Sequence, residues 1–326
     1  MRKRAQLPRE KLPPWMSRID RRGRVAFVPA RFFRVSTGKS VSVLRIALWV
    51  CIASYGWVGA AGPSVARGQA FSAPQPPEVS ARSGVLWDLS HRTALWEKSS
   101  EQSNPLASTS KLMTAIVVMR KTGLLGDVVV NRQDLIFLGG SYAPTVRLVP
   151  GDRIPVRELV KALVIASSNE AANVLARYCS GSVARFVQEM NASAQEMGCK
   201  GTHFADPHGL SPDTRGTASD LVRIFERFLR FPLLAHWAAQ TSDVLRDSEG
   251  RPLQLLFSTN RLSGIYPGLG PAKTGWTSAA GHSYVAVWGQ GERKAILVLL
   301  GSRDPWQDAW HLLDYLQSYY RAWSSQ

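Results

Sequence analysis

The sequence predicts an α/β protein of the α+β type, in which helices flank an antiparallel β-sheet and also form a helical subdomain. Three observations favour this class. Short β-like runs open the globular part, apolar residues at helical spacing fill its middle, and alternating strands followed by one helix close it. The 326 residues are 45% hydrophobic and include 11 Trp, which suffices for a packed core and excludes a disordered, collagen-like or disulfide-stapled chain.

The first half of the globular part begins with strands and continues with helices. Strands are predicted at 84–89 and 94–97, joined by a polar turn, and apolar spacing then predicts a helix over 108–121 with Gly123 as its C-cap. Residues 127–150 look extended. Four further helices follow at 155–166, 170–179, 182–197 and 217–230.

From residue 271 the apolar period changes to two, as in a strand, and Tyr284, Ala286 and Trp288 alternate with the residues between them. A turn at 289–292 leads into a second strand at 295–300. The final helix is predicted at 304–323, and its aromatic and leucine stripe is interpreted as core packing rather than membrane contact.

The charge of the chain is concentrated at its N-terminus. Lys and Arg number 40 against 24 Asp and Glu, a net charge of +16, but residues 1–45 alone hold 13 of the bases and only two acids. The rest of the chain is only mildly basic. The excess is therefore not the footprint of a nucleic-acid-binding domain, and no nucleic-acid partner is expected.

An uncharged apolar segment, 46–61, follows this basic arm directly. A positive stretch, an apolar stretch and then small residues form the order of an export signal. The apolar segment is slightly long for a cleaved signal and slightly short for a retained membrane anchor, so both stay open. We expect a basic cytoplasmic arm at 1–45, a signal or membrane-anchor segment at 46–62, a linker at 63–79 and a globular domain at 80–326. The domain is thus expected to be exported and periplasmic or extracytoplasmic, with membrane contact only through the N-terminal segment.

The cysteines leave one question open. Cys51 lies in the apolar segment, while Cys179 and Cys199 lie in the part expected to be exported. An oxidising compartment would permit a bridge between the latter two, but two buried thiols fit the spacing equally well.

Three short motifs suggest nucleophilic catalysis. They are Ser-Thr-Ser-Lys at 108–111, Ser-Ser-Asn at 167–169 and Lys-Thr-Gly at 273–275. Each has a look-alike, at 36–39, 258–260 and 121–123, but these lie in the basic arm, in a predicted loop and at a helix end. The retained set is expected to start a helix, join two helices and start a strand.

The motifs resemble those of the low-molecular-mass penicillin-binding proteins, which are serine D-alanyl-D-alanine carboxypeptidases and endopeptidases sharing a fold with class A β-lactamases. The likeness runs from about residue 80 to 302 and includes Phe-Ala-Asp-Pro-His-Gly-Leu at 204–210. The resemblance implies a serine β-lactamase/DD-peptidase-like fold and makes 80–326 a DD-peptidase catalytic domain. It implies peptidoglycan stem peptides as substrates, β-lactams as covalent inhibitors, and no cofactor or metal.

The nucleophile and its base come from the first motif. Ser108 and Lys111 are three residues apart on a predicted helix, so their side chains can meet. Lys111 can take the serine proton only when it is uncharged, and burial beside a second cation, for which Lys273 is the candidate, would lower its pKa. The backbone N–H of Ser108 would stabilise an oxyanion, and the resemblance implies the backbone N–H of Trp276 as the second donor.

The other motifs would handle the leaving group and the substrate. Ser167 is expected to relay a proton to the leaving amine, and Asn169 to hold a peptide group of the substrate. Lys273 and Thr274 would receive the terminal carboxylate, and Gly275 would let a peptide lie along the strand. His203, Asp206 and His208 are assigned to a structural loop rather than to zinc, and His282 receives no role.

Two alternatives remain in view. A serine β-lactamase would need a glutamate that activates water, and the Glu-x-x-Leu-Asn pattern of that family is absent between Asn169 and Lys273. A non-catalytic cell-wall-binding module would keep the motifs without activity. Between carboxypeptidase and endopeptidase, the run Thr-Ser-Ala-Ala-Gly-His at 277–282 and the absence of a long C-terminal extension favour the endopeptidase slightly.

Overall fold

The computed structural model describes residues 73–136 and 145–324. The predicted basic arm at 1–45, the signal or anchor segment at 46–62 with Cys51, and most of the linker at 63–79 lie outside this range. Residues 73–79 have neither helix nor strand. No helix of the described residues is both long and apolar enough to cross a membrane.

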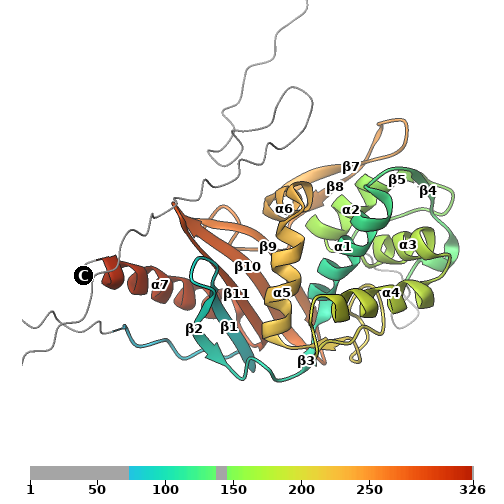
Figure 1. Ribbon diagram of the computed structural model, residues 1–326. Coiled ribbons are helices and arrows are strands. Elements are labelled where there is room, and N and C mark those ends of the chain that lie inside the picture. The colour runs from blue at the N-terminus through green and yellow to red at the C-terminus, as the bar shows by residue number, and fades with distance from the viewer. Residues whose placement is uncertain (1–72, 137–144, 325–326) are drawn as a thin grey trace, which may run out of the picture. The chain divides into compact units, whose positions relative to one another are not determined.

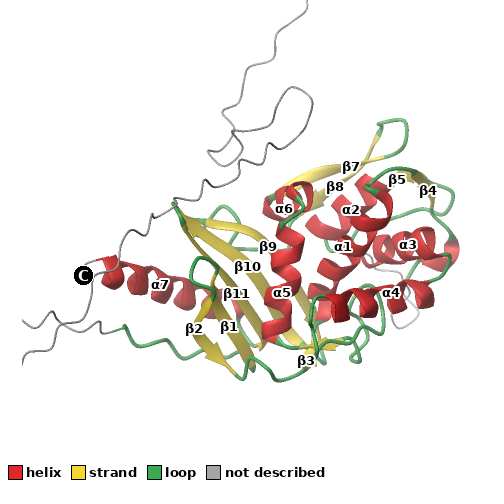
Figure 2. Ribbon diagram, in the orientation of Figure 1, coloured by secondary structure: helices red, strands yellow, loops and turns green. Residues whose placement is uncertain are grey.

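A five-stranded antiparallel sheet forms one layer of the domain (Figures 1 and 2). Its strand order is β2-β1-β11-β10-β9, so the first two and last three long strands of the domain lie side by side. The strands are β1 (Ser83–Asp88), β2 (Thr93–Lys98), β9 (Leu269–Thr277), β10 (Gly281–Gln290) and β11 (Arg293–Ser302). Strand β9 is an edge strand, which leaves one of its sides free to face the helical part.

The alternation in β10 serves two apolar cores, one on each face of the sheet. Val285 belongs to the core shared with the helical part, whereas Tyr284, Ala286 and Trp288 belong to a second core under the C-terminal helix α7 (Pro305–Ser324). Because successive strand side chains point to opposite faces, both sets are buried. The interpretation of the α7 stripe as core packing is confirmed for Leu313, Leu316 and Tyr320, whereas Trp310 and Trp323 are exposed.

The helical part contains the five predicted helices (Figure 2). Four of them lie within one residue of their expected ends, whereas the first begins three residues later than expected, at Lys111, because residues 107–110 form a 3-10 turn. The five helices are α1 (Lys111–Thr122), α2 (Val156–Ile165), α3 (Asn169–Ser180), α4 (Val183–Glu196) and α5 (Ala218–Leu229). Gly123 ends α1 in the left-handed conformation, with φ of 56°, and its N–H bonds to the carbonyl of Met119. A residue without a side chain adopts this conformation at no steric cost, as predicted for a C-cap.

The sequence analysis missed the segment between α5 and the sheet. This segment contains α6 (Pro232–Ala239) and a hairpin of β7 (Ser242–Arg246) and β8 (Pro252–Phe257). Both are short. Strand β8 buries Leu256 but exposes Leu253, Leu255 and Phe257, so it lacks the pattern from which a buried strand is recognised.

Two expected boundaries were wrong. The stretch 127–150 is not one extended segment, because it contains β4 (Asp127–Val129), which pairs with β5 (Arg153–Pro155), and the 3-10 turn η3 (Arg132–Asp134). The Lys-Thr-Gly motif does not start its strand, since β9 begins four residues earlier at Leu269. A last two-stranded pair joins β3 (Asn104–Pro105) to β6 (Arg215–Gly216).

Candidate active site

Ser108 lies in a 3-10 turn, η2 (Ala107–Ser110), that leads directly into α1. The Nζ of Lys111, in the first turn of α1, lies 2.6 Å from the Oγ of Ser108. The lysine side chain is 1% exposed. Ala107 has φ of 49°, a left-handed conformation that is unfavourable for a residue with a side chain. The expected meeting of Ser108 and Lys111 is therefore confirmed, and the turn that positions the serine is strained.

The loop between α2 and α3 supplies the second motif. Lys111 donates to the Oδ1 of Asn169 at 2.7 Å, and the Oγ of Ser167 lies 2.8 Å from the Nζ of Lys273. Ser168 points away and caps α3, accepting the N–H of Ala171. Ser167 also has a left-handed backbone, with φ of 59°. Such strain collects at functional sites, where surrounding contacts hold it in place.

Strand β9 brings the third motif against the nucleophile. A Cβ on Gly275 would lie 2.6 Å from the backbone nitrogen of Ser108, so only glycine lets the strand come this close. Lys273 is 2% exposed, whereas the Trp276 side chain is 61% exposed. The Oγ1 of Thr274 lies 2.5 Å from the Oγ1 of Thr259. Ser108, Lys111 and Asn169 thus form one cluster, Lys273 contacts Ser167, and the Gly275 backbone lies against that of Ser108.

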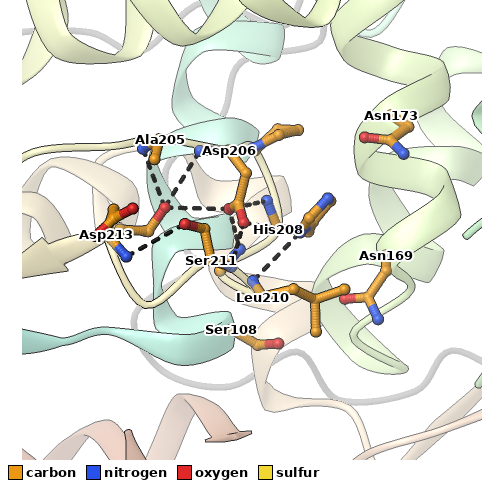
Figure 3. A network of polar contacts seen from close by, with 12 residues as sticks. Ser108, Asn169, Asn173, Ala205, Asp206, His208, Leu210, Ser211 and Asp213 are labelled. Atoms are coloured by element: carbon orange, nitrogen blue, oxygen red, sulfur yellow. Dashed lines mark hydrogen bonds and ion pairs between the residues drawn. The ribbon is translucent and has the colours of Figure 1, made fainter. Parts of the chain in front are cut away.

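Figure 3 shows a third loop, around Asp206 and His208, with its hydrogen bonds and with Ser108 and Asn169 nearby. This loop completes the surroundings of Lys111. The backbone carbonyl of His208 accepts a hydrogen bond from its Nζ at 2.7 Å. Asp206 holds this loop by accepting the N–H groups of Gly209 at 2.5 Å and Ser211 at 2.6 Å. The sequence analysis assigned this loop a structural role and missed the carbonyl, because backbone atoms leave no signature in a motif.

The loop also packs tightly under the nucleophile. Gly209 has φ of +84°, and a Cβ there would lie 1.8 Å from the carbonyl oxygen of Ala107. The Thr114 hydroxyl donates to the carbonyl of Pro207 at 2.5 Å. The loop at 204–210 therefore fixes both the strained turn before Ser108 and the first turns of α1.

Burial and charge both act on the two lysines. Burial, and next the positive charge of Lys273, hold the pKa of Lys111 well below its ordinary value, against the opposing attraction of Asp206 and Glu170. Burial lowers the pKa of Lys273 to about 7. Neither amine has a salt-bridge partner among the described residues, so both are costly to keep charged and burial favours their uncharged forms.

The carboxylates near the site behave differently from each other. Burial would raise the pKa of Asp206, but the hydrogen bond and positive charge of His208, together with the loop N–H groups, hold it below its usual range. Burial raises the pKa of Glu170, despite the opposing hydrogen bonds. Asp206 is thus the permanent negative charge of the region.

The remaining candidates have structural partners. The backbone of His203 pairs with that of Arg215, and the His282 ring lies 6.3 Å from that of Trp276 between centroids. Within 73–136 and 145–324, no three His, Cys, Asp or Glu residues form a group that could hold a metal ion. Cys179 and Cys199 are free thiols, which resolves the open question against a bridge between them.

A buried lysine on a sheet edge, facing a serine–lysine pair at a helix start, defines a serine hydrolase of the penicillin-binding and β-lactamase type. The chain belongs to the D-alanyl-D-alanine carboxypeptidase family, whose model matches residues 70–304. This family membership agrees with the resemblance found in the motifs.

Individual relatives support the same placement. The chain is 31% identical to D-alanyl-D-alanine carboxypeptidase DacF of Bacillus subtilis over 69% of its own length, but it spans only 58% of that relative. It is 30% identical to the D-alanyl-D-alanine endopeptidase of Escherichia coli, over 68% of this chain and 71% of the relative. The crystal structure of a D-alanyl-D-alanine carboxypeptidase from Mycobacterium tuberculosis superimposes with a TM-score of 0.69 at 29% identity, covering 76% and 94% of the two chains.

Proposed function

We propose that the chain is a serine DD-peptidase that hydrolyses D-Ala-D-Ala or D,D cross-link peptide bonds of peptidoglycan through an acyl-enzyme at Ser108. β-Lactams would acylate the same serine covalently. The observation that carries this proposal is the set of three oxygen atoms around the Nζ of Lys111, from Ser108, Asn169 and His208.

This set fits an uncharged amine that acts as a base. An uncharged lysine has two N–H groups and one lone pair. The amide oxygen of Asn169 and the carbonyl of His208 can only accept, so they take both N–H groups. The lone pair is left for the remaining neighbour, the hydroxyl of Ser108, from which it can remove the proton.

In the first step, Lys111 takes the proton of Ser108 and the serine Oγ attacks the carbonyl carbon of the penultimate D-alanine. The backbone N–H groups of Ser108 and Trp276 would stabilise the resulting oxyanion. The C–N bond then breaks, and Ser167 relays to the leaving amine the proton that Lys111 took from Ser108, which leaves Lys111 uncharged. Water attacks the carbonyl carbon of the acyl-enzyme and loses a proton to Lys111, and Lys111 returns this proton to the Ser108 oxygen as the acyl bond breaks.

Lys273 and Thr274 are proposed to bind the carboxylate of the leaving residue. Lys273 donates to the carbonyl of its neighbour Thr274 at 3.0 Å and is linked to Ser167 at 2.8 Å. This places a cation beside the hydroxyl that serves the leaving amine. The chemistry needs no metal or cofactor, as the resemblance implies.

Labelling with a fluorescent penicillin tests the nucleophile. We expect covalent label on the wild type and on Ser110→Ala, which removes a neighbouring buried hydroxyl that has no hydrogen-bond partner among the described residues. Label should be absent from Ser108→Ala. Persistent label on Ser108→Ala contradicts the assignment, and absence of label from the wild type favours a non-catalytic wall-binding module. Rapid loss of label with release of hydrolysed penicillin indicates a β-lactamase.

We further propose that the domain acts outside the cytoplasm, after export by the segment at 46–62, which serves as a cleaved signal or as a membrane anchor. Support comes from the order of basic arm, apolar stretch and small residues, and from the cell-wall substrate of the proposed reaction. Fractionation followed by N-terminal sequencing of the mature chain separates cleavage from retention. Mature chain recovered in the cytoplasm contradicts export.

A further inference from the structure

A groove of about 500 Å³ lies between the β7–β8 hairpin and the loop that precedes Ser167. The hairpin extends from α6 past α2 at the top of Figure 1. Neither the motifs nor the mechanism above uses this groove.

The walls of the groove are held in place by hydrogen bonds. The Gln254 side chain, on β8, accepts the N–H of Arg147 at 2.9 Å and donates to the carbonyl of Thr145 at 3.5 Å. On the other strand of the hairpin, the carbonyl of Val244 accepts from the buried Lys161 of α2 at 2.6 Å. The groove is therefore built before any ligand arrives, which lowers the cost of ordering a bound chain.

The surface of the groove is uncharged and mainly apolar, with polar side chains from Thr145, Gln254, Ser258 and Thr259. Leu255 is 57% exposed and Phe257 is 63% exposed, and both line it together with Ala166. They are two residues apart on β8, so their side chains leave the same face of the strand. Among the residues that the structure describes, no ionisable side chain lines the groove. Covering these side chains with an aliphatic segment would lower the free energy, because apolar surface is removed from water. A charged group would find no partner there.

The groove reaches the catalytic site at two points. Ala166 directly precedes Ser167, and Thr259, at the end of the groove, lies 2.5 Å from Thr274 between hydroxyl oxygens. In the proposed mechanism Ser167 serves the leaving amine and Thr274 receives the carboxylate of the leaving residue. Both points at which the groove reaches the catalytic site therefore lie on the leaving-group side of the scissile bond, not on the acyl side.

The two D,D substrates differ on that side. An uncross-linked pentapeptide releases D-alanine, whose methyl group is too small to reach beyond the carboxylate site. A cross-linked substrate releases an amine borne on the aliphatic side chain of a second stem peptide. Only this leaving group carries the extended aliphatic chain that an apolar groove beyond Thr274 can take up.

We propose that Leu255 and Phe257 form a leaving-side subsite for the aliphatic chain of the second stem, and that this subsite makes cross-linked peptides the preferred substrate. The proposal rests on the proposed DD-peptidase function and adds its specificity-determining residues. The two side chains bind the leaving group and take no part in bond making or proton transfer.

The test compares two substrates in one enzyme. We expect the double substitution Leu255→Ser with Phe257→Ser to lower kcat/KM for purified cross-linked dimers about tenfold, a typical loss for a truncated apolar subsite. D-Alanine release from uncross-linked pentapeptide and the rate of penicillin acylation should stay within about twofold. Leu253→Ser removes an exposed leucine from the same strand outside the groove and should leave both substrates unaffected.

A conservative variant guards against misfolding. Phe257→Leu keeps an apolar side chain and should retain most of the activity on dimers. Equal losses on both substrates, no loss on dimers, or a wild type that cleaves only pentapeptides would overturn the subsite while leaving the DD-peptidase intact. A wild type that neither cleaves any D,D substrate nor accepts penicillin overturns the proposed function itself.

Discussion

Replacing Lys273 by Met should stabilise the protein at low pH while impairing it as an enzyme. The lysine is fully buried, and burial lowers its pKa from 10.5 to about 7. This difference corresponds to about 5 kcal/mol of unfavourable free energy for a buried ammonium. Met loses the hydrogen bonds to Ser167 and to the carbonyl of Thr274, at about 1 kcal/mol each, so about 3 kcal/mol of net stabilisation is expected at pH 6.

The pH dependence has a definite sign. Because the pKa of Lys273 is lower in the folded protein, the unfolded chain binds more protons between about pH 7 and 10.5. The wild type therefore gains stability as the pH rises through this window, and the Met variant does not. The advantage of the variant should shrink by about 3 kcal/mol between pH 6 and pH 9.

Urea unfolding followed by tryptophan fluorescence at the two pH values measures this difference. Lys161→Met is the matched control, because Lys161 is a buried lysine that does have acidic partners, with Glu158 at 2.8 Å. Breaking that pair leaves an uncompensated carboxylate and should destabilise the protein by about 3 kcal/mol. A stability difference for Lys273→Met that does not change with pH, or that is negative at pH 6, refutes the argument from burial. Penicillin acylation by this variant should also slow at neutral pH, since the pKa of Lys111 rises when the neighbouring cation is removed.

Three further outcomes follow from the site. Gly275→Ala places a Cβ 2.6 Å from the backbone nitrogen of Ser108. We therefore expect at least tenfold slower penicillin acylation and a free energy of unfolding that is about 1–3 kcal/mol lower. Acylation at the wild-type rate contradicts the close approach. Asp206→Asn removes the anion that favours the charged form of Lys111, so the acid limb of the acylation pH profile should move to lower pH. The hydrogen bonds lost from the loop should also cost about 2 kcal/mol in the free energy of unfolding. A shift of the acid limb to higher pH refutes the electrostatic role of Asp206. The two described cysteines are free, so a reducing agent should leave the melting temperature unchanged, and a drop would reveal a disulfide.

The local elements could be predicted where burial imposes a period on the sequence. Helix α5 buries one side against the core, so its apolar spacing stands out. Strand β10 buries both faces, so its middle is an unbroken apolar run from Tyr284 to Trp288, and the flanking turns mark it as a strand. The β7–β8 hairpin escaped prediction because Leu255 and Phe257 are exposed. Their pattern reflects the groove they line rather than the core, and no periodicity rule covers that case.

Part of the site was equally local. Ser108 and Lys111 are one helical turn apart, so helix geometry alone brings their side chains together. The sequence by itself therefore determined this pair, and its motifs and periodicity also determined the family and the covering of a sheet by helices. The contact between Lys273 and Ser167 joins residues 106 positions apart, and the carbonyl of His208 reaches Lys111 from 97 positions away. Only the tertiary structure decided these contacts, because packing β9 and the 204–210 loop against α1 excludes water and so lowers the lysine pKa values.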